Sequence, residues 1–289
     1  MASGKARKQQ TTITAGIGAF ALAAVLTAPL AFGEESPAPP QPKALSAAAM
    51  PAPFSQDCQV GNEQIVEQSP LPNVAAALAQ RKRIKILAIG SSSSLGRRYT
   101  HPGGHSEQVR DILQTAIKGL DVVMINRGVS GELSAQAASR IKDEVALNDP
   151  DLVLWQVGTN DALAYVPLDE LEHTIVDTVH WLREHKVDVV LAGLQYVKAE
   201  SQDDHYKAVR ELLRKIAAKE NVAIVRRYEA QRLIAQAEGS GGGLAPDEFQ
   251  RSEVGYACLS QYMARAITLG IFGQNLRVRP ITPPVQPQN

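Results

Sequence analysis

The fold follows from Ile84-Lys85-Ile86-Leu87-Ala88-Ile89-Gly90-Ser91-Ser92-Ser93-Ser94-Leu95-Gly96, an aliphatic run that ends in a serine-rich turn. The run has the length and flanks of a buried strand and is too short to form a helix of its own. Open α/β sheets bind their ligands at the carboxyl ends of the strands, where this turn is expected to lie. We therefore expect the turn to carry small hydroxyl side chains into a site, although a serine turn without function is the alternative.

Four more apolar runs predict strands, and the segments between the strands show helical periodicity. The five strands are expected at 84–89, 122–125, 152–157, 187–194 and 222–225. The helices are expected at 71–81, 105–117, 133–145, 168–185, 203–219 and 252–269. This alternation predicts a three-layer α/β/α sandwich with a five-stranded parallel sheet. Right-handed crossovers align the carboxyl ends of parallel strands, so the turns Gly90–Gly96, Gly128–Gly131 and Gly158–Asp161 are expected to meet at one edge.

These three turns together contain the groups that acyl transfer needs. A serine hydroxyl attacks an acyl carbon when its proton is removed and the developing oxyanion is stabilised. Backbone N–H groups of a turn and an amide side chain are suitable donors to an oxyanion. The turns offer both kinds of donor, with Gly131 and Asn160 as the natural candidates.

The turns resemble the conserved blocks of the SGNH hydrolases, also called GDSL lipases or esterases. The first block, G-D-S-x-[ST]-x-G, is matched by residues 90–96, with Ser91 in place of the aspartate. The third block, G-x-N-D, is intact at residues 158–161, and the resemblance extends from Ile84 to Ile267. It implies a flavodoxin-like fold and a serine esterase that needs no cofactor and acts on small acyl or acetyl esters, including carbohydrate or lipid esters. Ser92 would be the nucleophile, and the oxyanion hole would consist of the Ser92 N–H, Gly131 and Asn160.

The fourth part of the pattern differs from the family. The family closes with D-x-x-H shortly before a Gly-Tyr pair, which here is Gly255-Tyr256. The aspartate falls on Asp247 and the histidine position falls on Gln250. A glutamine side chain does not titrate in water, so it cannot accept the proton of the serine. An active site without its base retains roughly 10³–10⁴-fold catalysis over water from the oxyanion hole and substrate binding.

Three explanations of Gln250 remain open. A histidine from elsewhere can replace the missing base, and the candidates are His101, His105 and His205. Alternatively, the domain binds a ligand, such as a carbohydrate, without turning it over. The third explanation is weak hydrolysis by another route.

Several other side chains have both a structural and a functional interpretation. Trp155 and Tyr165 could line an acyl pocket, but core packing is the favoured interpretation. Arg226-Arg227-Tyr228 could meet an anionic substrate, but a solvated rim is favoured. Cys58 and Cys258 form either a disulfide, in an oxidising compartment, or two isolated thiols, with Cys258 buried.

Composition and terminal segments limit the partners and the location of the protein. Residues 1–33 predict a signal peptide or a retained N-terminal membrane anchor, and a periplasmic or secreted protein. A Pro/Ala-rich linker at 34–57 precedes a domain at 58–275, and a Pro-rich tail follows at 276–289. Lys+Arg and Asp+Glu both number 30 and aromatic residues make up 5%, which argues against nucleic acid as a partner. The sequence has neither a metal-ligand spacing nor a dinucleotide or phosphate-loop fingerprint.

Overall fold

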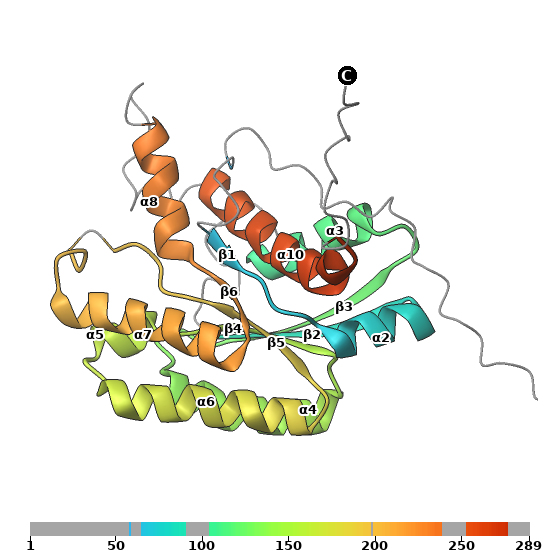
Figure 1. Ribbon diagram of the computed structural model, residues 1–289, viewed down its shortest axis with the longest axis horizontal. Coiled ribbons are helices and arrows are strands. Elements are labelled where there is room, and N and C mark those ends of the chain that lie inside the picture. The colour runs from blue at the N-terminus through green and yellow to red at the C-terminus, as the bar shows by residue number, and fades with distance from the viewer. Residues whose placement is uncertain (1–57, 59–64, 91–103, 198, 239–252, 277–289) are drawn as a thin grey trace, which may run out of the picture. The chain divides into compact units, whose positions relative to one another are not determined.

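A computed structural model describes residues 58, 65–90, 104–197, 199–238 and 253–276, all within one compact unit, Ser46–Asn289. Within these residues a single sheet has the strand order β1-β6-β5-β4-β2-β3 (Figure 1). Its strands are β1 Val66–Glu67, β2 Arg83–Gly90, β3 Asp121–Gly128, β4 Leu152–Gln156, β5 Asp188–Ala192 and β6 Ala223–Val225. Strands β2 to β6 pair in parallel, whereas β1 pairs antiparallel with β6.

The five predicted strands are confirmed, but the prediction of a five-stranded, all-parallel sheet is wrong at one edge. A sixth strand, β1, adds two residues there, with Val66 opposite Val225 and Glu67 opposite Ile224. Two residues are too few to show an alternating pattern in the sequence. Strand β1 is identified only by its antiparallel pairing with β6 in the structure.

Helices cover both faces of the sheet, which confirms the three-layer architecture (Figure 1). One apolar core packs α2, α3 and α10 against one face, and the other core packs α4, α6 and α7 against the opposite face. Neighbouring residues of β2 alternate between the two cores: Ile86 belongs to the first and Leu87 to the second. The bounds of these helices are α2 Pro72–Arg81, α3 Gly104–Ala116, α4 Ser134–Asn148, α6 Leu168–Glu184, α7 Asp204–Glu220 and α10 Glu253–Leu276.

Two further helices were not predicted, α5 Thr159–Leu163 and α8 Arg227–Glu238. The short α5 begins inside the third turn, and α8 begins two residues after β6 ends. Trp155 is fully buried in the core, as predicted. Tyr165 is 60% exposed, so the prediction that it packs in the core is wrong.

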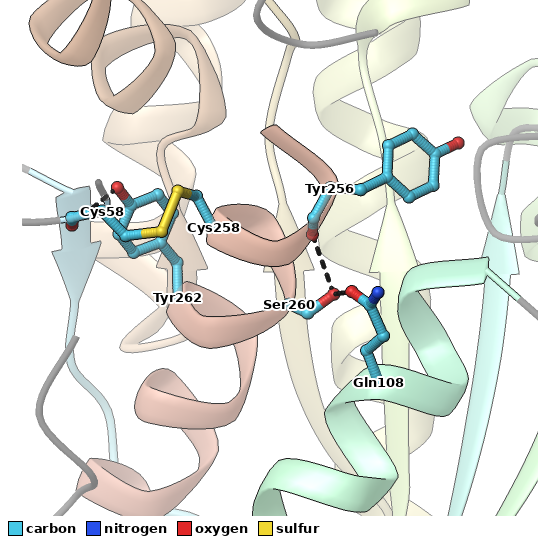
Figure 2. Close-up of a disulfide and its surroundings, with 6 residues drawn as sticks. All are labelled: Cys58, Gln108, Tyr256, Cys258, Ser260 and Tyr262. Carbon is cyan, nitrogen blue, oxygen red and sulfur yellow. Dashed lines mark hydrogen bonds between the residues drawn. A yellow bond between two sulfur atoms is a disulfide. The ribbon is translucent and has the colours of Figure 1, made fainter. Parts of the chain in front are cut away.

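Cys58 and Cys258 form a disulfide, which decides between the two interpretations of the cysteines (Figure 2). Cys258 lies near the start of α10, and the hydroxyl of Tyr262 on the same helix donates to the backbone carbonyl of Cys58 at 3.0 Å. Ser260 donates to Gln108 on α3 at 2.8 Å, so the same part of α10 is also fastened to its neighbouring helix.

The interpretations of residues 1–33, 34–57 and 277–289 concern segments outside the described residues, and they stay predictions. Leu276, the first residue of the predicted tail, is the last residue of α10. None of the helices in the described part of the chain combines the length and the apolar character that crossing a bilayer demands.

Candidate active site

The ends of β2, β3 and β4 meet at the carboxyl edge of the sheet, as the sequence predicted. Gly90 and Gly128 are register partners, and the N–H of Val129 donates to the carbonyl of Gly90 at 2.7 Å. Strand β4 lies on the other side of β2, with Trp155 opposite Ile89. The start of the serine turn is therefore held between the turns that follow β3 and β4.

Gly90 is required by a close approach of two backbones. Its φ is +131°, a conformation that side chains with a Cβ rarely adopt. A Cβ at this position would lie 2.6 Å from the Cβ of Gln156 and 2.7 Å from its carbonyl oxygen. Gly90, the last residue of β2, therefore packs directly against Gln156, the last residue of β4. This contact fixes the position at which the serine turn begins.

The two predicted oxyanion donors come from turns that are directly bonded to each other. Asn160 Nδ2 donates to the backbone carbonyl of Glu132, the residue after Gly131, at 2.7 Å. The carboxylate of Glu132 in turn pairs with Arg140 at 2.5 Å. An amide nitrogen carries a second hydrogen, so Asn160 is held in place while it keeps a donor for a ligand. Gly131 is exposed and adopts a φ of +75°, which suits a glycine at a turn.

Asp161 fixes the relative position of the same two turns. Its carboxylate accepts from the Ser134 backbone N–H at 2.8 Å and from the Ser134 hydroxyl at 2.6 Å, at the first residue of α4. It also accepts from the N–H of Gly158 at 3.2 Å. The side chain is only 2% exposed, so these charge-assisted bonds lie away from water. The sequence motif contained Asp161, but nothing in the sequence identified Ser134 as its partner.

His105 is buried in the first turn of α3, close to the predicted start of this helix. It is 1% exposed, and its Nε2 is in hydrogen-bonding contact with the side-chain amide nitrogen of Gln156. Burial, with a smaller contribution from the charge of Arg227, lowers the pKa of His105 to about 3. His105 is therefore neutral at pH 7. Its Nδ1 is buried and has no hydrogen-bond partner among the described residues.

His205 lies in a different cluster, at the start of α7. Its ring stacks on Tyr165 at a centroid distance of 5.2 Å. The Tyr165 hydroxyl donates to Asp203 at 2.8 Å, and Asp203 caps α7 by accepting from the N–H of Tyr206. Of the histidines proposed as replacement bases, His101 lies outside the described residues. Ser92, Asp247 and Gln250 do so as well.

Arg227 is buried at the same edge of the sheet, so the interpretation of this residue as part of a solvated rim is wrong. It is 3% exposed and begins α8. Its Nε donates to the carbonyl of Gly193 at 2.5 Å, and its Nη2 donates to the hydroxyl of Thr159 at 3.4 Å. Arg227 therefore joins the segment after β5 to the turn that carries Asn160. Two adjacent arginines in the sequence gave no signal that one of them is buried.

Comparison with known proteins agrees with this architecture. Residues 57–272 match the Non-GDSL lipase-like family. An arylesterase from Vibrio mimicus is 26% identical over 111 residues, which are 38% of this chain and 54% of that protein. The chain thus spans about half the length of this curated relative.

Solved structures with a similar fold include an acetylxylan esterase from Geobacillus stearothermophilus, with a TM-score of 0.51 and 21% identity. The alignment covers 65% of this chain and 94% of that chain. A catalytic mutant of the same enzyme gives a TM-score of 0.53 over 64% of this chain. At this level of identity the likeness shows a shared fold. The family match spans well over half of the sequence, and the chain therefore belongs to the Non-GDSL lipase-like family.

Proposed function

We propose that this protein is a carboxylic ester hydrolase that uses Ser92 as its nucleophile. The observation that carries the proposal is the bond from Asn160 to the carbonyl of Glu132, which holds Asn160 beside Gly131. These two residues match the oxyanion donors of the SGNH hydrolases. Fixed donors of this kind stabilise the charge of the transition state without reorganisation during the reaction.

In the proposed reaction Ser92 Oγ adds to the acyl carbon of the ester. Negative charge develops on the carbonyl oxygen and is stabilised by the N–H groups of Ser92 and Gly131 and by the amide of Asn160. Collapse of this intermediate releases the alcohol and leaves an acyl-serine. Water then attacks the acyl-serine, which frees the acid and regenerates Ser92.

Removal of the serine proton is the weak step. Gln250 occupies the position of the base and cannot accept a proton, and Asp247 is left without a histidine to orient. His105 is a poor replacement, because a group with a pKa of about 3 has little affinity for a proton at neutral pH. We therefore propose slow hydrolysis, and the second candidate function, favoured by Gln250, is ligand binding without turnover.

We further propose small acyl or acetyl esters as substrates, on carbohydrate or lipid. Support comes from the arylesterase relative and from the structural likeness to an acetylxylan esterase. The Cys58–Cys258 disulfide supports a periplasmic or secreted location, because disulfides persist in oxidising compartments. Residues 1–33 would then direct export, either as a cleaved signal or as a retained anchor.

Hydrolysis of p-nitrophenyl acetate by the full chain tests this proposal. Wild type, Ser92→Ala and Gln250→His are compared, with Ser94→Ala as a matched control from the same turn. Activity in the wild type and in Ser94→Ala that disappears in Ser92→Ala supports a serine hydrolase. A gain in Gln250→His alone supports an oxyanion hole that lacks only its base. If the rates of all four proteins equal the buffer rate, the catalytic proposal fails and ligand binding becomes the better account.

A further inference from the structure

Arg227 holds a buried positive charge at the carboxyl edge of the sheet. Its guanidinium lies between the segment after β5 and the turn after β4, where it donates to Gly193 O and Thr159 Oγ1. Both partners are neutral. The remaining N–H groups of the guanidinium have no partner among the described residues.

Two acidic side chains of the neighbouring elements are engaged elsewhere. Asp161 accepts from Ser134 and Gly158, and Glu229 on α8 pairs with Arg210 at 3.4 Å. No carboxylate in the described part of the chain forms an ion pair with Arg227. Its neighbour Arg226 differs in this respect, because it pairs with Glu67 at 3.9 Å.

Tyr206 does not supply the missing negative charge either. The Tyr206 hydroxyl donates to the carbonyl of Gln195 at 2.7 Å. Burial raises the pKa of Tyr206, so its phenol stays protonated at neutral pH. Burial also lowers the pKa of Arg227 to about 10, which still leaves the guanidinium charged at pH 7.

An isolated buried charge is unfavourable, and proteins ordinarily pair such charges. The guanidinium fork matches the oxygens of a carboxylate or a phosphate and can bind them through two parallel bonds. A buried guanidinium without an ion-pair partner in the described part of the chain is therefore suited to bind the anionic group of a ligand.

The position of Arg227 places this cation at the candidate active site. Thr159, which accepts from Arg227, is the residue directly before Asn160. His105 also lies close enough for the charge of Arg227 to act on its imidazole. The buried Nδ1 of His105, without a partner among the described residues, is a second polar atom in the same region.

We propose that Arg227 binds an anionic oxygen group, a carboxylate or a phosphate, on the ester substrate. This inference rests on the proposed function and narrows its substrates to esters that carry a negative charge. Arg227 is thus a specificity-determining residue that takes no part in the proton transfers.

Matched ester pairs test the inference with the full chain. For charge on the acyl side, mono-4-nitrophenyl glutarate is compared with 4-nitrophenyl valerate. For charge on the alcohol side, 4-acetoxybenzoate is compared with its methyl ester. The variants are Arg227→Gln and Arg227→Lys, with Arg226→Gln as the matched control that removes a charge one residue away.

We expect the wild type to prefer the charged ester of one pair by roughly 10- to 100-fold in kcat/KM, the value of about one charge-assisted bond. Arg227→Gln should abolish the preference, Arg227→Lys should keep part of it, and Arg226→Gln should keep all of it. The pair that shows the preference identifies the side of the ester that carries the charge. Equal rates for both members of both pairs in the wild type, or an equal loss for charged and neutral esters in Arg227→Gln, would overturn the inference.

A binding measurement separates this inference from the proposed function if no ester is hydrolysed. The melting temperature is then recorded with glutarate or inorganic phosphate at increasing concentration. A rise in the wild type and in Arg226→Gln that is absent in Arg227→Gln supports an anion site even without catalysis. No rise in the wild type with either anion would count against it.

Discussion

Asn160 donates its side-chain amide to the backbone carbonyl of Glu132, the residue that follows Gly131. One hydrogen bond thereby joins the turn after β4 to the turn after β3 and aligns two donors that the proposed chemistry needs together. The carboxylate of Asp161 makes a second link between the same turns through Ser134. Gly131 and Asn160, two donors of the proposed oxyanion hole, are therefore positioned by contacts that do not involve the serine turn.

Replacement of Asn160 by alanine should lower kcat strongly and lower the free energy of unfolding only slightly. Loss of one oxyanion donor typically reduces kcat by about 10²–10³-fold, whereas one neutral hydrogen bond contributes about 1 kcal/mol to folding. The measurement combines p-nitrophenyl acetate hydrolysis with urea unfolding. Asn148→Ala, which removes an amide that bonds to Glu144 at the end of α4, is the control and should keep its activity. Equal activity in the two variants would exclude Asn160 as a donor.

The bond between Asp161 and Ser134 should show strong energetic coupling. A buried bond to a charged acceptor contributes about 1.5–3 kcal/mol, and removal of one partner leaves the other unsatisfied. A double-mutant cycle with Asp161→Asn and Ser134→Ala, followed by urea unfolding, measures this coupling. We expect about 1–3 kcal/mol. A cycle with Asp161→Asn and the distant Thr115→Ala should give additive effects, and additivity in both cycles would contradict the assignment.

Gly90→Ala should destabilise the protein far more than Gly119→Ala. Both glycines have positive φ, so alanine is strained at either position, which costs of order 1–3 kcal/mol. At Gly90 the added Cβ also meets Gln156 at 2.6 Å, whereas at Gly119 nothing lies within 4 Å. Overpacking adds about 1–3 kcal/mol at Gly90 alone. Thermal unfolding of both variants measures the difference, and equal shifts in Tm would argue against the close contact.

The main strands were predictable because each is marked by a short apolar run in the local sequence. Runs such as Ile86–Ile89 are apolar throughout, as expected for strands covered on both faces. β1 was not predictable, because its two residues gain strand geometry only by pairing with β6. The carboxyl ends of β2, β3 and β4 were correctly placed at one edge, since parallel topology leaves no other arrangement.

The side chains of the site were less predictable because their burial depends on distant neighbours. Arg227 reads as a surface residue beside Arg226, but Gly193 and Thr159, far away in the sequence, supply the acceptors that allow its burial. The start of a helix was expected at His105, but the sequence did not indicate its contact with Gln156, which lies inside the fold. Tyr165 was expected in the core but lies at the surface, where its hydroxyl donates to Asp203. Polar side chains carry no periodic signal that reveals such partners.

Reduction of the Cys58–Cys258 disulfide should lower the stability of the folded chain. The disulfide links residues that are 200 positions apart, and closing a long loop restricts the unfolded chain, a contribution of about 2–5 kcal/mol. The measurement is the urea midpoint with and without dithiothreitol. The variant Cys58→Ala/Cys258→Ala should be less stable and should no longer respond to the reductant. A wild type that is equally stable with and without dithiothreitol would contradict this expectation.

The buried imidazole of His105 should make stability depend on pH in the mildly acidic range. In the folded chain burial, and secondarily the charge of Arg227, lowers the pKa of His105 to about 3, against 6.5 for the ordinary group. Between these pH values the unfolded chain binds a proton that the folded chain does not. The free energy of unfolding therefore falls as the pH drops below about 6.5, by at most roughly 5 kcal/mol when pH 3 is reached.

The pH dependence is tested by urea unfolding at pH 7, 6, 5 and 4 for wild type and His105→Gln. The substitution removes the titrating group, so the slope of stability against pH should be shallower in the variant, even if its stability at pH 7 is lower. His180→Gln is the control, because His180 is 52% exposed and bonds to Glu220 at the surface. Carboxylates that titrate in the same range and do not contact His105 contribute equally to wild type and His105→Gln, so they cancel in that comparison. Parallel slopes for wild type and His105→Gln would show that the imidazole gains a proton in the folded state as readily as in the unfolded chain.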